Sequence, residues 1–226
     1  MTQGVFIVGT DTGVGKTRVA TALLRAWVRR GLRVAGMKPV AAGAVLRGGV
    51  LRSEDAEALV AAANVEAPWD WINPYCFAPP VAPHIAAMRA GVSIDMTVIR
   101  DAYHRLAERA ERVVVEGAGG LLVPLSGRAD MASIAQELEI PVILVVGMRL
   151  GCLNHALLTA QAIAARGLAL VGWVANSIDP AMEERRANLA WLQGQLAAPC
   201  LGCLPYADTA QNWAMDWSAL DAVFRA

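Results

Sequence analysis

The sequence predicts an α/β fold with a mostly parallel sheet flanked by helices on both faces. Short apolar runs alternate along the chain with longer stretches of helical spacing. The hydrophobic content is 56%, yet no apolar run approaches the roughly 18 residues that would cross a membrane. Strands buried on both faces explain such a composition. A glycine-rich loop between the first predicted strand and the first predicted helix is the third indication.

Six strands and six helices are expected in this alternation. The strands are predicted at residues 5–8, 33–37, 112–115, 142–146, 170–175 and 200–204. The helices are predicted at residues 16–30, 54–63, 95–109, 132–138, 154–166 and 182–196. Gly31 and Gly167 stand where helix C-caps favour glycine. We expect residues 68–83 to form a structured loop, residues 212–217 to serve packing, and residues 1–226 to form one domain.

Charge and cysteine content narrow the possible partners. The net charge is zero at pH 7, which gives no reason to expect binding to nucleic acid or an anionic membrane. The four cysteines are too few for a disulfide scaffold, and no leader peptide precedes the first strand, so we expect a cytoplasmic protein. Cys200 and Cys203 lack a second Cys/His pair for zinc and are interpreted as two half-buried strand residues.

Lysine is confined to two positions, Lys16 and Lys38, among twenty basic residues. A compact ammonium on a flexible stem reaches in among phosphate oxygens in a way that a planar guanidinium does not. Lys16 lies in the glycine-rich loop, and Lys38 follows the second predicted strand. Both are therefore candidate functional residues rather than surface charges.

The loop from Gly9 to Thr17 reads GTDTGVGKT and indicates a nucleoside triphosphate site with Mg²⁺. A strand, a glycine-rich turn and a helix place backbone N–H groups around an anion. Lys16 is expected at the outer phosphates and the Thr17 hydroxyl at the metal. The first glycine falls at position 9, one residue earlier than in the common pattern, where Thr10 stands.

Three further segments carry candidate chemistry. In VVVEGAGG, Glu116 ends a predicted strand before a small-residue turn, which is typical of a metal-directed carboxylate, although a solvated glutamate after a tight turn has the same pattern. Lys38 in MKPVAAG is suited to stabilising charge that develops during phosphoryl or acyl transfer, the alternative being a surface lysine. Ser53, Glu54 and Asp55 read as an N-cap with helix-dipole acids, and the pattern alone assigns them no further role.

Taken together, GTDTGVGKT, MKPVAAG, NPYCFAPPVAPHIA, VVEGAGGLLVPL, PVILVVGMRLGCLNHALLTAQ and GWVANS resemble the dethiobiotin synthetases, over about residues 4–208. The resemblance implies a phosphate-loop NTPase-like fold and a homodimer with sites at the subunit interface. It also implies ATP- and Mg²⁺-dependent ring closure of 7,8-diaminononanoate with CO₂ in biotin synthesis. One amine becomes a carbamate, ATP phosphorylates it, and the other amine attacks the resulting anhydride.

Specific roles follow from the same resemblance. The implied Mg²⁺ ligands are Thr17, Asp55 and Glu116, so the resemblance gives Asp55 a role that its sequence pattern did not. Lys38 and Lys16 are the implied catalytic residues. The partner subunit's helix start, with Gly151, Cys152 and Asn154 in this numbering, is implied to cap the substrate carboxylate. Ala42 occupies a substrate position where the family often has a hydroxyl. The implied nucleotide contacts are Gly13, Val14, Gly15, Lys16, Thr17, Asp55, Glu116, Gly117, Ala118, Gly119, Asn176, Ser177, Pro205, Tyr206 and Ala207.

Three rival interpretations are weaker. A ParA/MinD-type switch ATPase has a lysine early in the loop, where this chain has Asp11. A cobyrinate amidase-type ligase needs a glutaminase domain, for which 226 residues leave no room. A nucleotide-bound regulator without activity would not need Lys38 and three metal ligands, although Ala42 is compatible with it.

Overall fold

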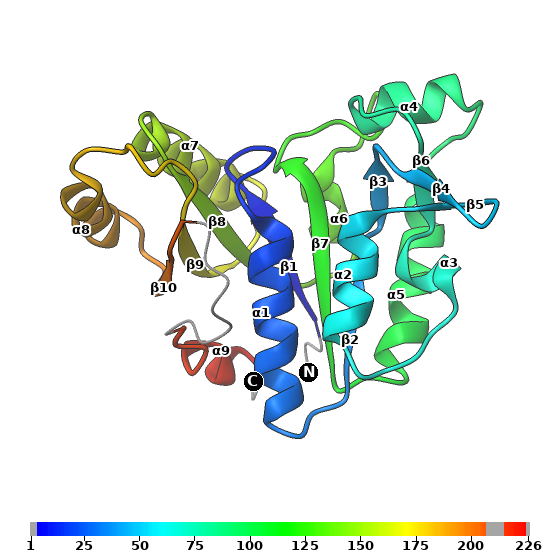
Figure 1. Ribbon diagram of the computed structural model, residues 1–226, viewed down its shortest axis with the longest axis horizontal. Coiled ribbons are helices and arrows are strands. Elements are labelled where there is room, and N and C mark those ends of the chain that lie inside the picture. The colour runs from blue at the N-terminus through cyan, green and yellow to red at the C-terminus, as the bar shows by residue number, and fades with distance from the viewer. Residues whose placement is uncertain (1–3, 207–214, 225–226) are drawn as a thin grey trace.

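A six-stranded parallel sheet forms the centre of the molecule, with strand order β10-β9-β8-β1-β7-β2. The computed structural model describes residues 4–206 and 215–224 (Figure 1). The strands of this sheet are β1 (Gly4–Gly9), β2 (Val34–Met37), β7 (Arg112–Gly120), β8 (Val142–Met148), β9 (Leu170–Ser177) and β10 (Cys200–Leu204). All five pairings within it are parallel. The predicted fold class is confirmed.

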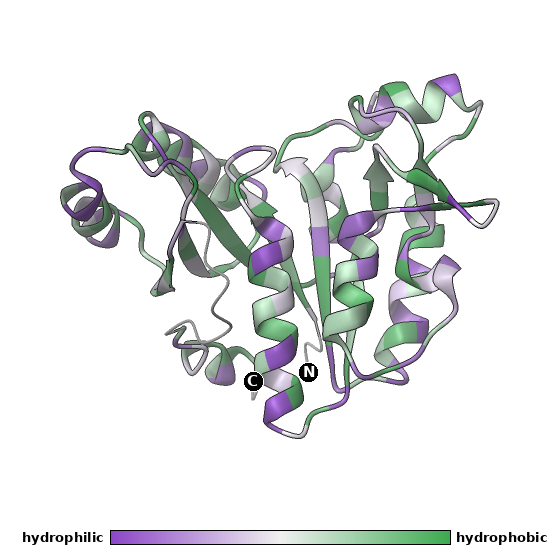
Figure 2. Cartoon of the chain, in the orientation of Figure 1, coloured by the Kyte–Doolittle hydropathy of each residue, from purple (hydrophilic) through white to green (hydrophobic). Residues whose placement is uncertain are grey.

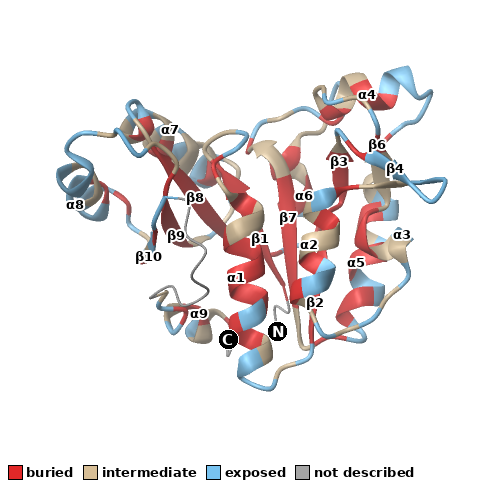
Figure 3. Cartoon of the chain, in the orientation of Figure 1, coloured by how far each residue is buried: buried red, intermediate tan, exposed pale blue. Residues whose placement is uncertain are grey.

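Helices cover both faces of this sheet and divide the core into two layers. On one face, α1 (Lys16–Arg29), α2 (Glu54–Ala62) and α9 (Ala219–Val223) pack on side chains such as Val5 and Ile7 of β1. On the other face, α5 (Met96–Ala107), α6 (Met131–Glu137), α7 (Cys152–Ala165) and α8 (Arg185–Gln195) pack with Phe6 and Val8. The side chains of consecutive β1 residues thus point into opposite core layers. Because both faces of the strand are covered, its sequence is an unbroken apolar run. Hydropathy and burial show the same layering (Figures 2 and 3).

Local capping supports the helix boundaries. Gly31 and Gly167 have φ values of 79° and 68°, the left-handed conformation expected after a helix. The Ser53 hydroxyl accepts a hydrogen bond from the Ala56 N–H at 3.5 Å, as an N-cap does. No helix in the described part of the chain is long and apolar enough to cross a bilayer.

Several predicted boundaries are wrong, and β7 is the most informative case. The strand was expected to stop before Glu116, but it continues to Gly120, where it pairs again with Gly9 of β1. The small residues that suggested a turn instead allow a close approach, since a Cβ on Gly117 would lie 2.9 Å from the Phe6 ring. Similarly, α7 begins at Cys152 rather than at 154, and α8 begins at Arg185 rather than at 182.

Short elements near the β2 end of the sheet were not predicted. β3 (Val40–Ala42) pairs in parallel with β6 (Tyr75–Phe77), and β4 (Val45–Arg47) forms a hairpin with β5 (Val50–Arg52). The segment 68–83, predicted as a loop, contains α3 (Trp69–Ile72) and β6 and ends at the first residue of α4 (Pro83–Arg89). Three-residue strands carry too little periodicity to be recognised in a sequence.

The remaining expectations concern the C-terminal part. Trp217 is buried in the α1 layer, in agreement with a packing role, while residues 212–214 lie outside the described residues. The expectation of two half-buried cysteines in β10 is wrong for Cys203, which is exposed, and holds for Cys200. The reason is an irregularity in β10 between Cys200 and Gly202, where its pairing with β9 shifts register.

Candidate functional site

The phosphate loop joins β1 to α1 and turns on glycines. Gly13 and Gly15 have φ values of 73° and 92°, which other residues rarely adopt. A Cβ at Gly9 would lie 2.5 Å from Val14 Cγ2 and 2.9 Å from the Asp11 carbonyl. The early glycine is therefore required because the loop folds back on this residue. Lys16 donates to the Asp11 carbonyl oxygen at 3.0 Å across the loop.

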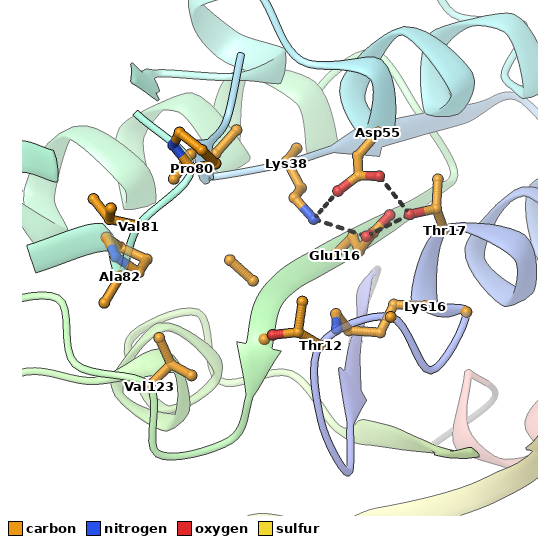
Figure 4. A pocket seen from close by; sticks show the side chains of 17 residues that line it. Thr12, Lys16, Thr17, Lys38, Asp55, Pro80, Val81, Ala82, Glu116 and Val123 are labelled. Carbon is orange, nitrogen blue, oxygen red and sulfur yellow. Dashed lines mark hydrogen bonds and ion pairs between the residues drawn. The ribbon is translucent and has the colours of Figure 1, made fainter. Parts of the chain in front are cut away.

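A cluster of four side chains lies beside this loop (Figure 4). Lys38 Nζ is 2.7 Å from Glu116 Oε1 and 2.7 Å from Asp55 Oδ2. Thr17 Oγ1 is 2.8 Å from Asp55 Oδ1 and 2.8 Å from Glu116 Oε1. The four residues come from α1, the end of β2, the start of α2 and the middle of β7. The fold thus brings together residues that are separated by up to 99 positions in the chain.

Burial and charge act against each other in this cluster. Burial alone would lower the pKa of Lys38, but the charges of Glu116 and Asp55 raise it above the usual range. Burial raises the pKa of Glu116 against the opposing effect of Lys38. Burial would also raise the pKa of Asp55, but Lys38 and Thr17 hold it below the usual value. Burial, with Lys38 as a second cause, lowers the pKa of Lys16 to about 8.

A cavity of about 670 Å³ runs from the phosphate loop past this cluster. Its polar end is formed by loop residues together with Lys38, Asp55 and Glu116, and its other end by small and apolar side chains (Figure 4). The lining residues are Thr12, Gly13, Gly15, Lys16, Thr17, Lys38, Ala41, Ala42, Asp55, Pro80, Val81, Ala82, Pro83, Glu116, Ala118, Gly119 and Val123. Such a cavity suits a ligand with an anionic end and an aliphatic body.

The donor set at the polar end suits a hard cation. Two carboxylates and a hydroxyl are the oxygen ligands that Mg²⁺ prefers, and Mg²⁺ usually completes its shell with phosphate oxygens and water. Glu116 Oε2 is buried and has no hydrogen-bond partner among the described residues, which leaves an acceptor available. No group of three or more His, Cys, Asp or Glu side chains suited to a metal occurs in residues 4–206 and 215–224. A cation here would therefore depend on Thr17 and on ligand oxygens.

Other predicted nucleotide residues lie outside this cavity. The Asn176 amide donates to the Val14 carbonyl at 2.7 Å and accepts from Arg18 at 3.0 Å, which ties the end of β9 to the loop. Arg18 also donates to the Pro205 carbonyl at 2.6 Å. Ser177 accepts from Arg185 at 3.2 Å in a separate pocket. Tyr206 is half exposed, Val14 and Gly117 are buried in the loop and β7, and Ala207 lies outside the described residues.

The predicted carboxylate-binding residues lie at the start of α7, away from the cavity. Gly151 is the N-cap, with φ 92°, followed by Cys152 and then Asn154 in the first turn. Arg149, just before them, pairs with Asp11 of the phosphate loop at 2.6 Å. The Thr12 N–H and then Arg149 lower the pKa of Asp11. This ion pair connects the loop to the α7 end of the sheet.

Sequence reasoning missed the wall formed by Pro80, Val81, Ala82 and Pro83. The segment has no titratable group, so its residue types gave no chemical signal. Only the repeated prolines set it apart, because they fix an extended backbone before α4. Thr12 was also missed, although it lies inside the loop that was recognised.

Comparisons with known proteins identify the family of the chain. A family model described as an AAA domain matches residues 3–213. The ATP-dependent dethiobiotin synthetase of Nitrosospira multiformis is 53% identical over 206 residues, which cover 91% of this chain and 89% of that protein. The corresponding protein of Aromatoleum aromaticum is 55% identical over 209 residues, covering 91% and 93%.

Solved structures share the fold at low identity. The septum site-determining protein MinD of Pyrococcus horikoshii, in complex with Mg-ADP, has a TM-score of 0.54 and 19% identity, covering 91% of this chain and 82% of that one. The signal recognition particle receptor FtsY of Elizabethkingia anophelis has a TM-score of 0.55 and 16% identity, covering 99% and 66%. These structures show a phosphate-loop NTPase fold. The identity to the curated proteins goes further: the chain belongs to the dethiobiotin synthetase family.

Proposed function

We propose that this protein is an ATP-dependent ligase that converts 7,8-diaminononanoate and CO₂ to dethiobiotin, in biotin biosynthesis. The observation that carries the proposal is the position of Lys38, held by Glu116 and Asp55 in the same cavity as Lys16 and Thr17. A phosphate-binding end and a second cation beside it suit transfer of a phosphoryl group to an anionic acceptor. Family membership supports the named substrates.

Mg²⁺ fits this site with Thr17, Asp55 and Glu116 as its protein ligands. When bound, it supplies positive charge that neutralises the triphosphate. The proposed nucleotide contacts are the loop residues Gly13–Thr17, the β7 segment Glu116–Gly119, and Asn176, Ser177 and Pro205–Ala207 at the base. Asn176 is already held by Val14, so its amide is fixed before a nucleotide arrives.

Lys38 acts on the reacting groups in this proposal. One substrate amine takes up CO₂ as a carbamate, whose negative charge Lys38 stabilises as the γ-phosphoryl group transfers to it. The second amine then attacks the carbamic-phosphoric anhydride, which closes the ring and releases phosphate. Lys16 holds the outer phosphates during the transfer. The two carboxylates that hold Lys38 raise its pKa, which favours the charged form of the amine.

The aliphatic end of the cavity is proposed to hold the substrate chain, and a homodimer is proposed to complete the site. Ala42 lines the cavity without a polar side chain, so the hydroxyl contact often present in the family is absent at this position. In the dimer, the partner subunit's Gly151, Cys152 and Asn154 would bind the substrate carboxylate, because a helix N-terminus offers backbone N–H groups to an anion.

A direct assay tests the proposal. The protein is incubated with 7,8-diaminononanoate, bicarbonate and Mg-ATP, and dethiobiotin and ADP are measured by mass spectrometry and a coupled assay. We expect one ADP for each dethiobiotin and little ATP hydrolysis without the diamine. Hydrolysis that is independent of the diamine and stimulated by DNA or lipid vesicles would instead identify a switch ATPase.

A further inference from the structure

The backbone of Lys38 lies between two strands and belongs to neither. β2 ends at Met37 and β3 begins at Val40. β2 is also an edge strand of the central sheet in the described part of the chain, with β7 as its neighbour. The ladder of the sheet therefore does not itself fix the residue that carries the ammonium group of the cluster. Another segment has to hold this backbone if Nζ is to keep a constant position.

The end of α3 supplies that support. The Lys38 N–H donates to the Ile72 carbonyl oxygen at 2.7 Å, and the Asn73 side-chain amide donates to the Lys38 carbonyl oxygen at 2.6 Å. Both backbone groups of Lys38 are thus bonded to two consecutive residues. Beyond them, the Tyr75 N–H donates to the Pro39 carbonyl oxygen at 3.1 Å, where β3 and β6 begin to pair.

The Asn73 amide acts as a donor that the main chain cannot replace. Pro74 follows it and has no backbone N–H group. The amide nitrogen donates to the Tyr75 carbonyl oxygen at 3.1 Å as well as to that of Lys38. The amide oxygen is buried and accepts from none of the described residues. Two carbonyl oxygens require N–H groups opposite them, so an ionised carboxylate of the same shape would not serve here.

The side chain of Lys38 extends from this support toward the cavity. Figure 4 shows it pointing to Asp55 and Glu116, the two carboxylates that hold Nζ. In the proposed function these carboxylates also serve a cation, so their hold on Nζ is shared with it. The bonds to the Lys38 backbone are not shared, because residues 72–73 are not among those that line the cavity.

We propose that Asn73 is a positioning residue for Lys38, whose backbone its amide fixes so that the ammonium group reaches the reacting groups. This rests on the function proposed above, in which Lys38 stabilises the charge that develops on the phosphoryl acceptor. Asn73 is buried outside the cavity and does not contact the ligands. A displacement of about 1 Å in a catalytic site can cost about 100-fold in rate. Loss of the amide should therefore lower kcat and spare ligand binding.

The scarcity of lysine makes the placement of Lys38 measurable without an activity assay. Lys16 and Lys38 are the only lysines in the sequence, so protein grown with ¹³C,¹⁵N-lysine gives two Cε signals and two amide signals, which Lys16→Arg assigns. In Asn73→Ala we expect the Lys38 Cε signal to shift or broaden and the Lys38 amide to exchange faster with solvent, while the Lys16 signals stay in place. Asn73→Ser gives the same test with a smaller change in polarity.

Two results of this measurement would overturn the inference. One is an unchanged Lys38 signal in a folded Asn73 variant, with folding checked by circular dichroism. The other needs no variant: the Lys38 amide of the wild type is expected to exchange slowly, because it is buried and bonded to Ile72. Rapid exchange there would show that the end of α3 does not hold this backbone.

Asn64 is the matched control at the opposite end of β2. Its side chain accepts from the Val34 N–H at 2.8 Å and donates to the Leu32 carbonyl oxygen at 2.9 Å. Asn64→Ala therefore removes contacts of the same kind from the same strand. We expect it to lower Tm and to leave the Lys38 signals and kcat unchanged. Equal changes in the Lys38 signals of both alanine variants would indicate a general loosening of β2 and overturn the inference.

The product assay completes the test. Asn73→Ala should lower kcat about 10- to 100-fold and leave KM for the diamine and Kd for Mg-ATP within about twofold. Asn73→Asp, which keeps the size and loses the N–H donors, should show the same loss. A wild-type kcat in these variants, or a loss confined to ligand binding, contradicts the inference. A wild-type protein that forms no dethiobiotin would refute the proposed function, while the Lys38 signals would still decide whether Asn73 positions Lys38.

Discussion

The two lysines of this chain occupy sites of different character. Lys16 is buried in the phosphate loop and has a pKa lowered to about 8, whereas two carboxylates raise the pKa of Lys38. Among the described residues, Lys16 donates only to the Asp11 carbonyl oxygen, so a bound nucleotide would supply negative charge to it. Lys38 is instead already neutralised by the protein. The first is suited to binding and the second to catalysis.

Substitution of each lysine by arginine is expected to separate these roles. Lys38 is 2% exposed, and a guanidinium is too wide to reach both carboxylates from its position. Lys38→Arg should lower kcat for dethiobiotin by at least about 100-fold and leave the Kd for Mg-ATP within a few-fold. Lys16→Arg should weaken nucleotide binding itself. Calorimetric titration and the product assay distinguish the two, and near-normal turnover in Lys38→Arg would refute the argument.

Tyr103 gives a prediction about how the stability of the fold depends on pH. Burial raises the pKa of this α5 phenol from 10.0 to about 12. The unfolded chain releases the proton first, so the free energy of unfolding should fall as pH rises from 10 to 12, by up to about 3 kcal/mol in all. Below pH 10 the phenol contributes no pH dependence.

Tyr103→Phe should remove this alkaline loss of stability. The difference in free energy of unfolding between wild type and variant, measured with urea from pH 9 to 12, cancels the titration of groups common to both proteins. A difference that stays constant over this range would show that the phenol is not held neutral by the fold.

At the scale of elements, the central strands were predictable and the peripheral ones were not. Strands such as β8, buried along its whole length, show as continuous apolar runs. β3 and β4 have three residues each and exist through partners that lie elsewhere in the chain. The role of Asp55 in the site was also hard to predict from the pattern, because its sequence signal was that of a helix start. Its second role became visible only when α2 was placed beside Lys38.

Two glycine-to-alanine substitutions, one in β2 and one in α8, are expected to change the free energy of unfolding in opposite directions. A Cβ on Gly36 of β2 would lie 2.7 Å from Leu59 Cβ in α2 and 3.3 Å from Leu24 Cδ1 in α1. Gly36→Ala should therefore destabilise the protein by about 1–3 kcal/mol. Gly194 in α8 has no atom within 4 Å of the same position, so Gly194→Ala should stabilise it by about 0.5–1 kcal/mol. Urea unfolding measures both, and changes of the same sign would contradict the packing argument.

At the scale of the whole molecule, the proposed dimer would cover apolar side chains around α7. Leu150 is 92% exposed and Leu158 is 56% exposed, close to the helix start proposed to reach the partner's cavity. Leu158→Glu should give a folded monomer that binds nucleotide but forms little dethiobiotin, because the partner's carboxylate-binding residues are withdrawn. Sedimentation velocity and the product assay measure the two effects.

A second apolar surface residue provides the control for the dimer. Leu46 in the β4–β5 hairpin is 70% exposed, and Leu46→Glu should leave sedimentation and activity unchanged. A wild-type protein that is a fully active monomer would contradict the proposed dimer. Dissociation by both variants alike would contradict the location of its interface.

The order of strands in the sheet also bears on how the chain is made. β1 pairs only with β7 and β8 among the described strands, and these lie more than 100 residues further along. At cellular rates of synthesis, roughly 5 to 20 seconds pass before those partners exist. The loop that follows β1 therefore leaves the ribosome well before the two strands that hold β1 in the sheet. Until then, both edges of the apolar β1 lack their strand partners.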